Sequence, residues 1–131
     1  MGYYTDYELY VSAYQDGKQL GYQTIPALVA KDLEKEIDMM NVFESGDCST
    51  GWYANAKWYE HEDDMILLSK RFPELLFELS GTGEGNDDIW TSYFHDGASQ
   101  LCVAEIVYPP FDPSKMVKHS LNSDQKYSYQ N

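Results

Sequence analysis

The hydrophobic pattern of this chain changes its period several times, and this constrains the fold more than any other feature. Residues 7–14 alternate between apolar and polar side chains, which is typical of a half-buried strand. Residues 52–59 and 75–79 show the same alternation. Two intervening segments instead place apolar residues three or four positions apart, the spacing of one helix face. The pattern therefore predicts strands interleaved with two helices.

The first helix is expected to start near Thr24, which can cap a helix, and Pro26, which suits a first turn. Its predicted buried face is Val29, Leu33, Ile37 and Met40. We expect it to end before Gly46, where a polar loop follows.

The second helix is expected to open with the acidic run at 60–64, because acids in a first turn interact favourably with the helix dipole. Its buried stripe is Met65, Leu68 and Phe72, and Pro73 stops it.

Three strands are expected after the second helix: residues 75–79, 89–95 and 99–107, the last two joined by a hairpin turn at Asp96-Gly97. The order predicts an α+β fold, a mainly antiparallel sheet of four to five strands with two helices on one face, which is a ferredoxin-like arrangement. We expect a single domain over residues 1–113 and a polar, flexible or partner-ordered tail over 114–131.

The balance of charge is the strongest global signal. The chain has 22 acids against nine bases, a net charge of −13. This opposes binding to a nucleic-acid backbone, which needs clustered Lys and Arg, and favours a basic partner. Residues 72–114 contain eight acids and no Lys or Arg, so the surface could imitate nucleic acid. The alternative is that the acids only keep the protein in solution.

The stretch "GTGEGNDD" at 81–88 has three alternate glycines and ends in two acids. Phosphate binding is disfavoured, because Asn86 stands where a third glycine of the motif is needed and a strand, not a helix, is expected next. Glu84, Asp87 and Asp88 are suitable ligands for a cation, but calcium-loop spacing is absent. We expect an acidic connection between strands that can serve as a contact loop.

Signatures of catalysis are weak. The three histidines are scattered without zinc-binding spacing, and the many carboxylate pairs are expected by chance among so many acids. Cys48 and Cys102 form no C-x-x-C motif, which favours a reduced compartment, and Cys102 is expected in the core. We therefore expect no enzyme activity, no cofactor and no metal site.

Several motifs resemble those of a known family. The run "KWYEHEDDM" at 57–65, "LSKRFPEL" at 68–75 and "FEL" at 77–79 are followed by the glycine-acid loop and "DIWTSYFHDG". Together they resemble small phage and mobile-element proteins with a YubB-type ferredoxin-like domain, in which an "LS-x-x-F/YP-x-L-x-F-x-L" passage recurs. The segment "AEIVYPPFDPSKM" at 104–116 is similar to the C-terminal end of such proteins.

This resemblance implies a non-enzymatic protein in which Trp58, Leu68, Pro73 and Phe77 help to make the fold. It carries over no functional residue. The resemblance also implies a phage setting, in which small acidic accessory proteins often inhibit host defence, including CRISPR nucleases.

We therefore expect a non-catalytic, phage-type accessory protein that binds and inhibits a host protein, such as a defence nuclease, through an acidic, nucleic-acid-mimicking surface. The expected contacts are Glu60, Glu62, Asp63, Asp64, Glu84, Asp87 and Asp88, with Trp90 as an aromatic anchor. The alternative is a small-ligand or nucleotide-sequestering protein, in which the aromatic side chains would stack a base.

No apolar run reaches membrane-spanning length and no signal sequence is visible, so we expect the cytoplasm of a bacterial host, without membrane or direct nucleic-acid binding. An exposed sheet edge and twelve tyrosines are compatible with a homodimer.

Overall fold

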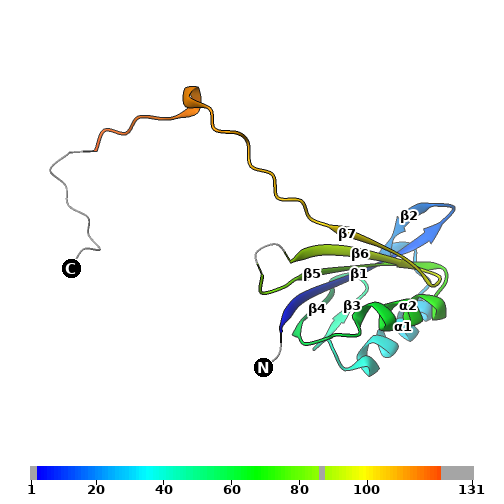
Figure 1. Cartoon of the computed structure of the whole chain (residues 1–131). Coiled ribbons are helices and arrows are strands. Elements are labelled where there is room, and N and C mark those ends of the chain that lie inside the picture. The colour runs from blue at the N-terminus through cyan, green and yellow to red at the C-terminus, as the bar shows by residue number, and fades with distance from the viewer. Residues whose placement is uncertain (1–2, 86–87, 122–131) are drawn as a thin grey trace.

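The computed structural model describes residues 3–85 and 88–121, which form an α+β fold (Figure 1). In this part of the chain, seven strands make one open antiparallel sheet, and two α-helices cover one of its faces. The strands are β1 (Thr5–Gln15), β2 (Lys18–Gly21), β3 (Gly46–Asp47), β4 (Gly51–Ala56), β5 (Leu75–Thr82), β6 (Ile89–His95) and β7 (Ala98–Val103). The helices are α1 (Ala27–Met40) and α2 (His61–Arg71), with 3-10 turns η1 (Tyr22–Thr24) and η2 (Pro113–Lys115).

The sheet has the order β3-β4-β1-β5-β6-β7, and β2 pairs with the end of β1. The central strand β1 is antiparallel to both of its neighbours, β4 and β5. This confirms the α+β class and the two helices, but the sheet has more strands than the expected four to five. The additional strands β2 and β3 are four and two residues long and lie in segments whose polar sequences resemble loops.

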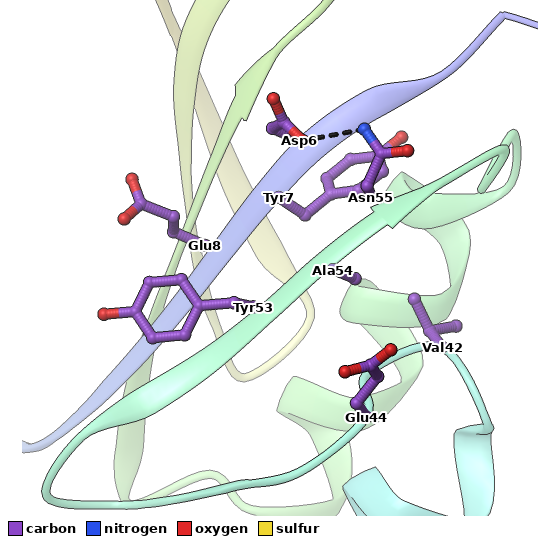
Figure 2. Close-up of a pocket in the computed structure, with 8 residues that line it drawn as sticks. All are labelled: Asp6, Tyr7, Glu8, Val42, Glu44, Tyr53, Ala54 and Asn55. Carbon is purple, nitrogen blue, oxygen red and sulfur yellow. Dashed lines mark hydrogen bonds between the residues drawn. The ribbon is translucent and has the colours of Figure 1, made fainter.

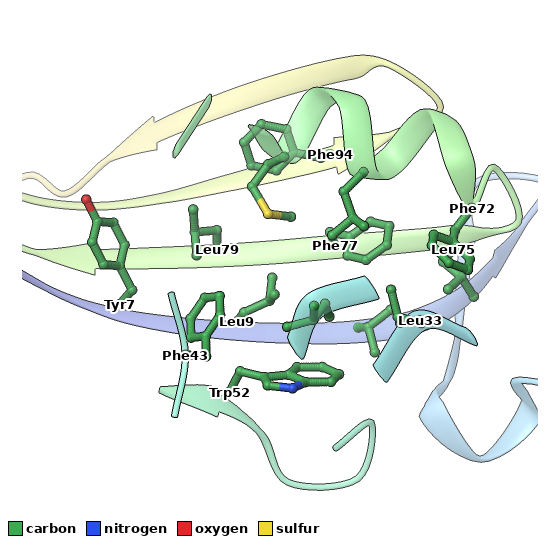
Figure 3. Packing of buried hydrophobic residues seen from close by; sticks show 14 of the residues in the cluster. Tyr7, Leu9, Leu33, Phe43, Trp52, Phe72, Leu75, Phe77, Leu79 and Phe94 are labelled. Atoms are coloured by element: carbon green, nitrogen blue, oxygen red, sulfur yellow. The ribbon is translucent and has the colours of Figure 1, made fainter. Parts of the chain in front are cut away.

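The core lies between the helices and the inner face of the sheet (Figure 3). Leu9 of β1 pairs with Leu79 of β5 and with Trp52 of β4, and all three side chains are buried. Leu33 and Ile37 of α1 are fully buried in this cluster, with Val29 and Met40 packed against it. The buried residues of α2 include Met65 and Leu68, and Phe72 follows its end. The helix faces expected from the sequence are therefore confirmed.

Several boundaries differ from those expected. Thr24 does not cap α1; its hydroxyl donates to the carbonyls of Leu20 and Gly21 inside the preceding turn, and Pro26 holds the cap position. The strand expected over 52–59 ends at Ala56, so Trp58 enters the core from a loop. Cys102 is exposed rather than in the core, because it lies on the edge strand β7, all of whose residues are exposed.

The two Asp-Gly pairs both form tight hairpin turns. Asp96 and Gly97 have φ angles of 45° and 83°, and Asp16 and Gly17 repeat this geometry with 53° and 77°. Positive φ at two successive residues is the geometry of the turn that matches strand twist, and it explains why the Asp-Gly signal was reliable.

After Val103 the chain leaves the domain as an extended arm, residues 104–121 (Figure 1). The last strand was expected to continue to Val107, and it ends earlier because β6 begins at Ile89 and offers no partner beyond it. Within the described residues, no helix is long and apolar enough to cross a membrane.

Candidate functional site

The acids expected to make contacts come from two distant segments, the start of α2 and the connection between β5 and β6. Both segments are tied to the N-terminal residues. The hydroxyl of Tyr3 donates to a carboxylate oxygen of Asp88 at 2.8 Å, and the backbone N–H of Tyr4 donates to Glu84 at 3.2 Å. The backbone N–H of Tyr3 donates to the hydroxyl of Tyr59, immediately before α2, at 3.1 Å. The two acidic segments therefore meet at one end of the sheet.

We call this region the acidic end. It comprises Glu60, Glu62, Asp63, Asp64, Glu84 and Asp88. The remaining expected contact, Asp87, lies outside the described residues.

Three of these acids present their side chains to solvent. Glu60 occupies the cap position of α2, and Glu62 and Asp63 follow in the first turn; all three are exposed. The positive end of the helix dipole favours negative charge at these positions. The exposed carboxylates are thus compatible with the local fold and available to a partner.

Asp64 has a different role within the same turn. It is half-buried, and its carboxylate accepts a hydrogen bond of 2.7 Å from the indole N–H of Trp58. Trp58 is buried against Tyr7 and Phe43, so its N–H needs a partner inside the protein. Asp64 therefore supports the packing of Trp58 as well as adding charge.

Trp90 faces the helices. Its ring stacks on His61, with ring centroids 4.9 Å apart and planes 18° apart, and meets the edge of Tyr7. It also lies across Gly81, its neighbour on β5. The half-buried Trp90 thus connects the sheet to the first residue of α2 and positions the acids that follow.

Few cations offset this charge. Lys57 comes near the acidic end, where its ammonium lies 4.9 Å above the ring of Tyr4. In the described part of the chain, the ion pair within 4 Å joins Arg71 to Glu36, at the opposite end of α2. The acidic end therefore keeps most of its negative charge.

Sequence reasoning missed Tyr3, Tyr4 and Tyr59, which hold the two acidic segments together. The only signal for them was the excess of tyrosine, which does not indicate where each hydroxyl will bond. Nor does the sequence indicate that Gly85 donates its N–H to the hydroxyl of Tyr3 at 2.8 Å.

A second acidic area lies beside β4, where β3 is too short to cover the strand. A hollow of about 600 Å³ opens there and is lined by Asp6, Glu8, Glu44, Tyr53 and Asn55, among others (Figure 2). The amide of Asn55 donates to Asp6 at 2.7 Å. Three carboxylates around this hollow would repel a phosphate group.

The uncovered face of the sheet also carries a pair of tyrosines that the sequence did not single out. The hydroxyls of Tyr10 and Tyr53 lie 2.7 Å apart. The hydrogen bond with Tyr53, together with some desolvation and the nearby Glu8, raises the pKa of Tyr10 to about 12. The hydroxyl of Tyr10 therefore remains uncharged at neutral pH.

Three side chains of types that often take part in catalysis, Cys48, His61 and His95, are partly buried or in contact with the backbone. Burial, together with the nearby Glu34, raises the pKa of the Cys48 thiol to about 12, which disfavours the reactive thiolate. The rings of His61 and His95 each lie within hydrogen-bonding distance of a backbone carbonyl. Among the described residues, no group of three His, Cys, Asp or Glu side chains is placed to hold a metal ion. The arrangement is suited to attracting a cationic surface.

Comparison of the chain with protein-family models, with curated proteins and with solved structures gave no match.

Proposed function

We propose that this chain is a non-catalytic accessory protein of phage type that binds a host protein through its acidic end and blocks a basic surface on it. One observation carries the proposal. The chain just before α2 and the β5–β6 connection are fastened together through the N-terminal residues: Tyr3 is hydrogen-bonded to Tyr59 and to Asp88, and Tyr4 to Glu84. Charged segments that are already positioned relative to each other bind a cationic surface with a smaller loss of conformational entropy than segments that must be ordered on binding.

We further propose that the acidic end acts as a nucleic-acid mimic toward a defence or CRISPR nuclease in the cytoplasm of a bacterial host. Two observations support this. The net charge of −13 favours a partner whose surface is basic. The motifs at 57–79 resemble those of YubB-type phage proteins.

The order of the elements supports a ferredoxin-like core. The elements β1, α1, β3, β4, α2 and β5 follow the β-α-β-β-α-β order, and β1 lies between β4 and β5 in the sheet. On this proposal β6 and β7 extend the core at one edge, and β2 lengthens the end of β1.

The expected contact residues take two roles in this proposal. Glu60, Glu62, Asp63 and Glu84 are exposed and touch the partner. Asp64, Asp88 and Trp90 are half-buried and hold the acidic end in shape. We predict that Asp87, which lies outside the described residues, also touches the partner.

The test is a comparison of two variants with the same net charge. Glu62→Lys with Asp63→Lys reverses charge at the acidic end, whereas Asp32→Lys with Asp38→Lys reverses exposed acids on α1. Wild type and both variants are used at low salt to capture proteins from a bacterial host lysate, with mass spectrometry as the readout. We expect a nucleic-acid-binding protein that wild type and the α1 variant retain and the acidic-end variant loses.

Equal loss of binding in the two variants would show that only the total charge matters, which would contradict a specific role for the acidic end. If both variants bound the partner as well as wild type does, the electrostatic mechanism would be wrong.

The alternative, sequestration of a nucleotide, gains no support from the hollow beside β4, because Asp6, Glu8 and Glu44 line it. A large rise in melting temperature with added nucleotide would favour this alternative over ours.

A further inference from the structure

The strand-favouring sequence of β7 continues past Val103, where the neighbouring strand β6 no longer provides a partner. Strand β7 pairs with β6 from Ala98 to Val103, and Ala104 donates a last hydrogen bond of 2.9 Å to the carbonyl of Ile89. Ile89 is the first residue of β6, so residues 105–108 have no neighbouring strand among the residues that the structure describes. Their sequence, Glu105-Ile-Val-Tyr108, nevertheless favours a strand.

The exposure of the apolar side chains in residues 106–108 to water is also unfavourable. Ile106, Val107 and Tyr108 are 53%, 80% and 83% exposed. Consecutive exposed apolar residues on an extended segment are typical of a surface that another chain covers.

The free edge of β7 lacks the usual protection against pairing. Its sequence, ASQLCV, has no charged residue and no proline, in a chain of which 24% is charged. Edge strands in natural proteins are normally blunted by charge, proline or a covering segment. All six residues of β7 are exposed, so nothing within the described residues covers this edge.

We propose that β7 and residues 104–108 pair with the same segment of a second copy of this chain, antiparallel, around a two-fold axis at Val103. With this register, Ala98–Val103 of each copy faces residues 103–108 of the other, and every strand-forming residue gains a partner. A register centred on the middle of β7, between Gln100 and Leu101, would pair β7 with β7 and leave 104–108 unpaired. Pro109 and Pro110 end the pairing, because proline has no N–H to donate.

The direction of the backbone groups fits this register. Ala104 directs its N–H toward β6, and neighbouring residues in an antiparallel ladder direct theirs to opposite sides. Val103 therefore directs its N–H and C=O away from β6, toward the proposed partner strand.

The distribution of charge favours a second copy of this chain as the partner of β7 and residues 104–108. Residues 1–103 hold 19 of the acids and six of the bases, whereas residues 113–121 hold Lys115 and Lys118 and no acid. The arm points away from its own domain (Figure 1). In the paired state the basic part of each arm extends toward the acidic domain of the other copy. Four exposed apolar residues can be covered there: Phe111, Met116, Val117 and Leu121.

The test uses proline at the axis. Val103→Pro removes the N–H that would join the two copies and leaves the bonds to β6 intact, while Val103→Thr keeps the N–H and the branched side chain. Sedimentation equilibrium of the full chain at micromolar concentration should give a dimer for wild type and for Val103→Thr, and a monomer for Val103→Pro. Circular dichroism checks that each variant is folded.

Crosslinking tests the register independently of whether the proline variant folds. In a Cys102→Ser background, Val103→Cys places two thiols opposite each other at the axis, where strand spacing of roughly 5.5 Å between Cα atoms allows a disulfide. Ser99→Cys places each thiol opposite Val107 of the other copy. We expect a covalent dimer on mild oxidation from the first variant and not from the second.

A monomeric wild type would overturn the proposal. So would a folded Val103→Pro variant that dimerises as strongly as Val103→Thr, or equal crosslinking at positions 99 and 103.

Discussion

At the scale of single residues, the contacts of Trp90 with Gly81 and His61 join β5 and β6 to the start of α2. Gly81 and Trp90 face each other across β5 and β6, and the indole of Trp90 occupies the space above Gly81. A β-carbon at position 81 would come within 2.5 Å of Cε2 of the indole. The first glycine of the "GTGEGNDD" stretch is therefore a packing residue within β5, and the turn begins after it.

We predict that Gly81→Ala destabilises the protein by about 1–3 kcal/mol, because the methyl group overpacks against the indole. Urea denaturation measures this. In a Trp90→Ala background the same substitution should have a much smaller effect, because the clashing ring is gone. Equal effects in both backgrounds would mean that the contact with Trp90 does not explain the glycine.

At the scale of elements, the first turn of α2 combines two kinds of acid that look alike in the sequence. Asp63 is exposed, while its neighbour Asp64 accepts the indole N–H of the buried Trp58. One acid is thus suited to contact with a partner and the other to support of the core.

We predict that Asp64→Ala lowers the free energy of unfolding by about 1–3 kcal/mol, because it leaves the indole N–H of Trp58 without a partner. Asp63→Ala should change stability by less than ~0.5 kcal/mol, as expected for an exposed position. Thermal or urea unfolding of the two variants provides the comparison. A larger loss in Asp63→Ala would contradict the roles assigned here.

Periodicity predicted the main elements well and their ends less well. The apolar spacing of α1 and α2 and the alternation of β1 and β5 are set by burial against one core, which local sequence records. The ends depend on distant partners. Strand β7 ends where β6 provides no further neighbour, and β3 forms because Gly46 and Asp47 pair with Trp52 and Gly51. Neither condition is visible in the residues themselves.

At the scale of the whole molecule, charge is divided unevenly between the domain and the arm. The acids exceed the bases by thirteen within residues 1–103, and the two charges balance in residues 104–131. The domain therefore presents a strongly negative surface, and the arm supplies apolar and basic side chains that suit a different kind of contact.

The candidate site was predictable in composition but not in arrangement. The acidic run at the start of α2 and the acids of the β5–β6 connection were both evident in the sequence. That they meet at one end of the sheet depends on hydrogen bonds from Tyr3 and Tyr4, which span more than fifty residues. Such long-range bonds leave no local pattern.

The central claim is that the acidic end, rather than the total charge, attracts the partner. The most direct measurement is the association rate constant for the captured host protein, determined by stopped-flow fluorescence at increasing salt. Our account predicts that Glu62→Lys with Asp63→Lys slows association about tenfold at low salt and flattens the salt dependence. The variant Asp32→Lys with Asp38→Lys should stay close to wild type. Equal rates for the two variants, or a wild-type rate that salt does not change, would contradict the account.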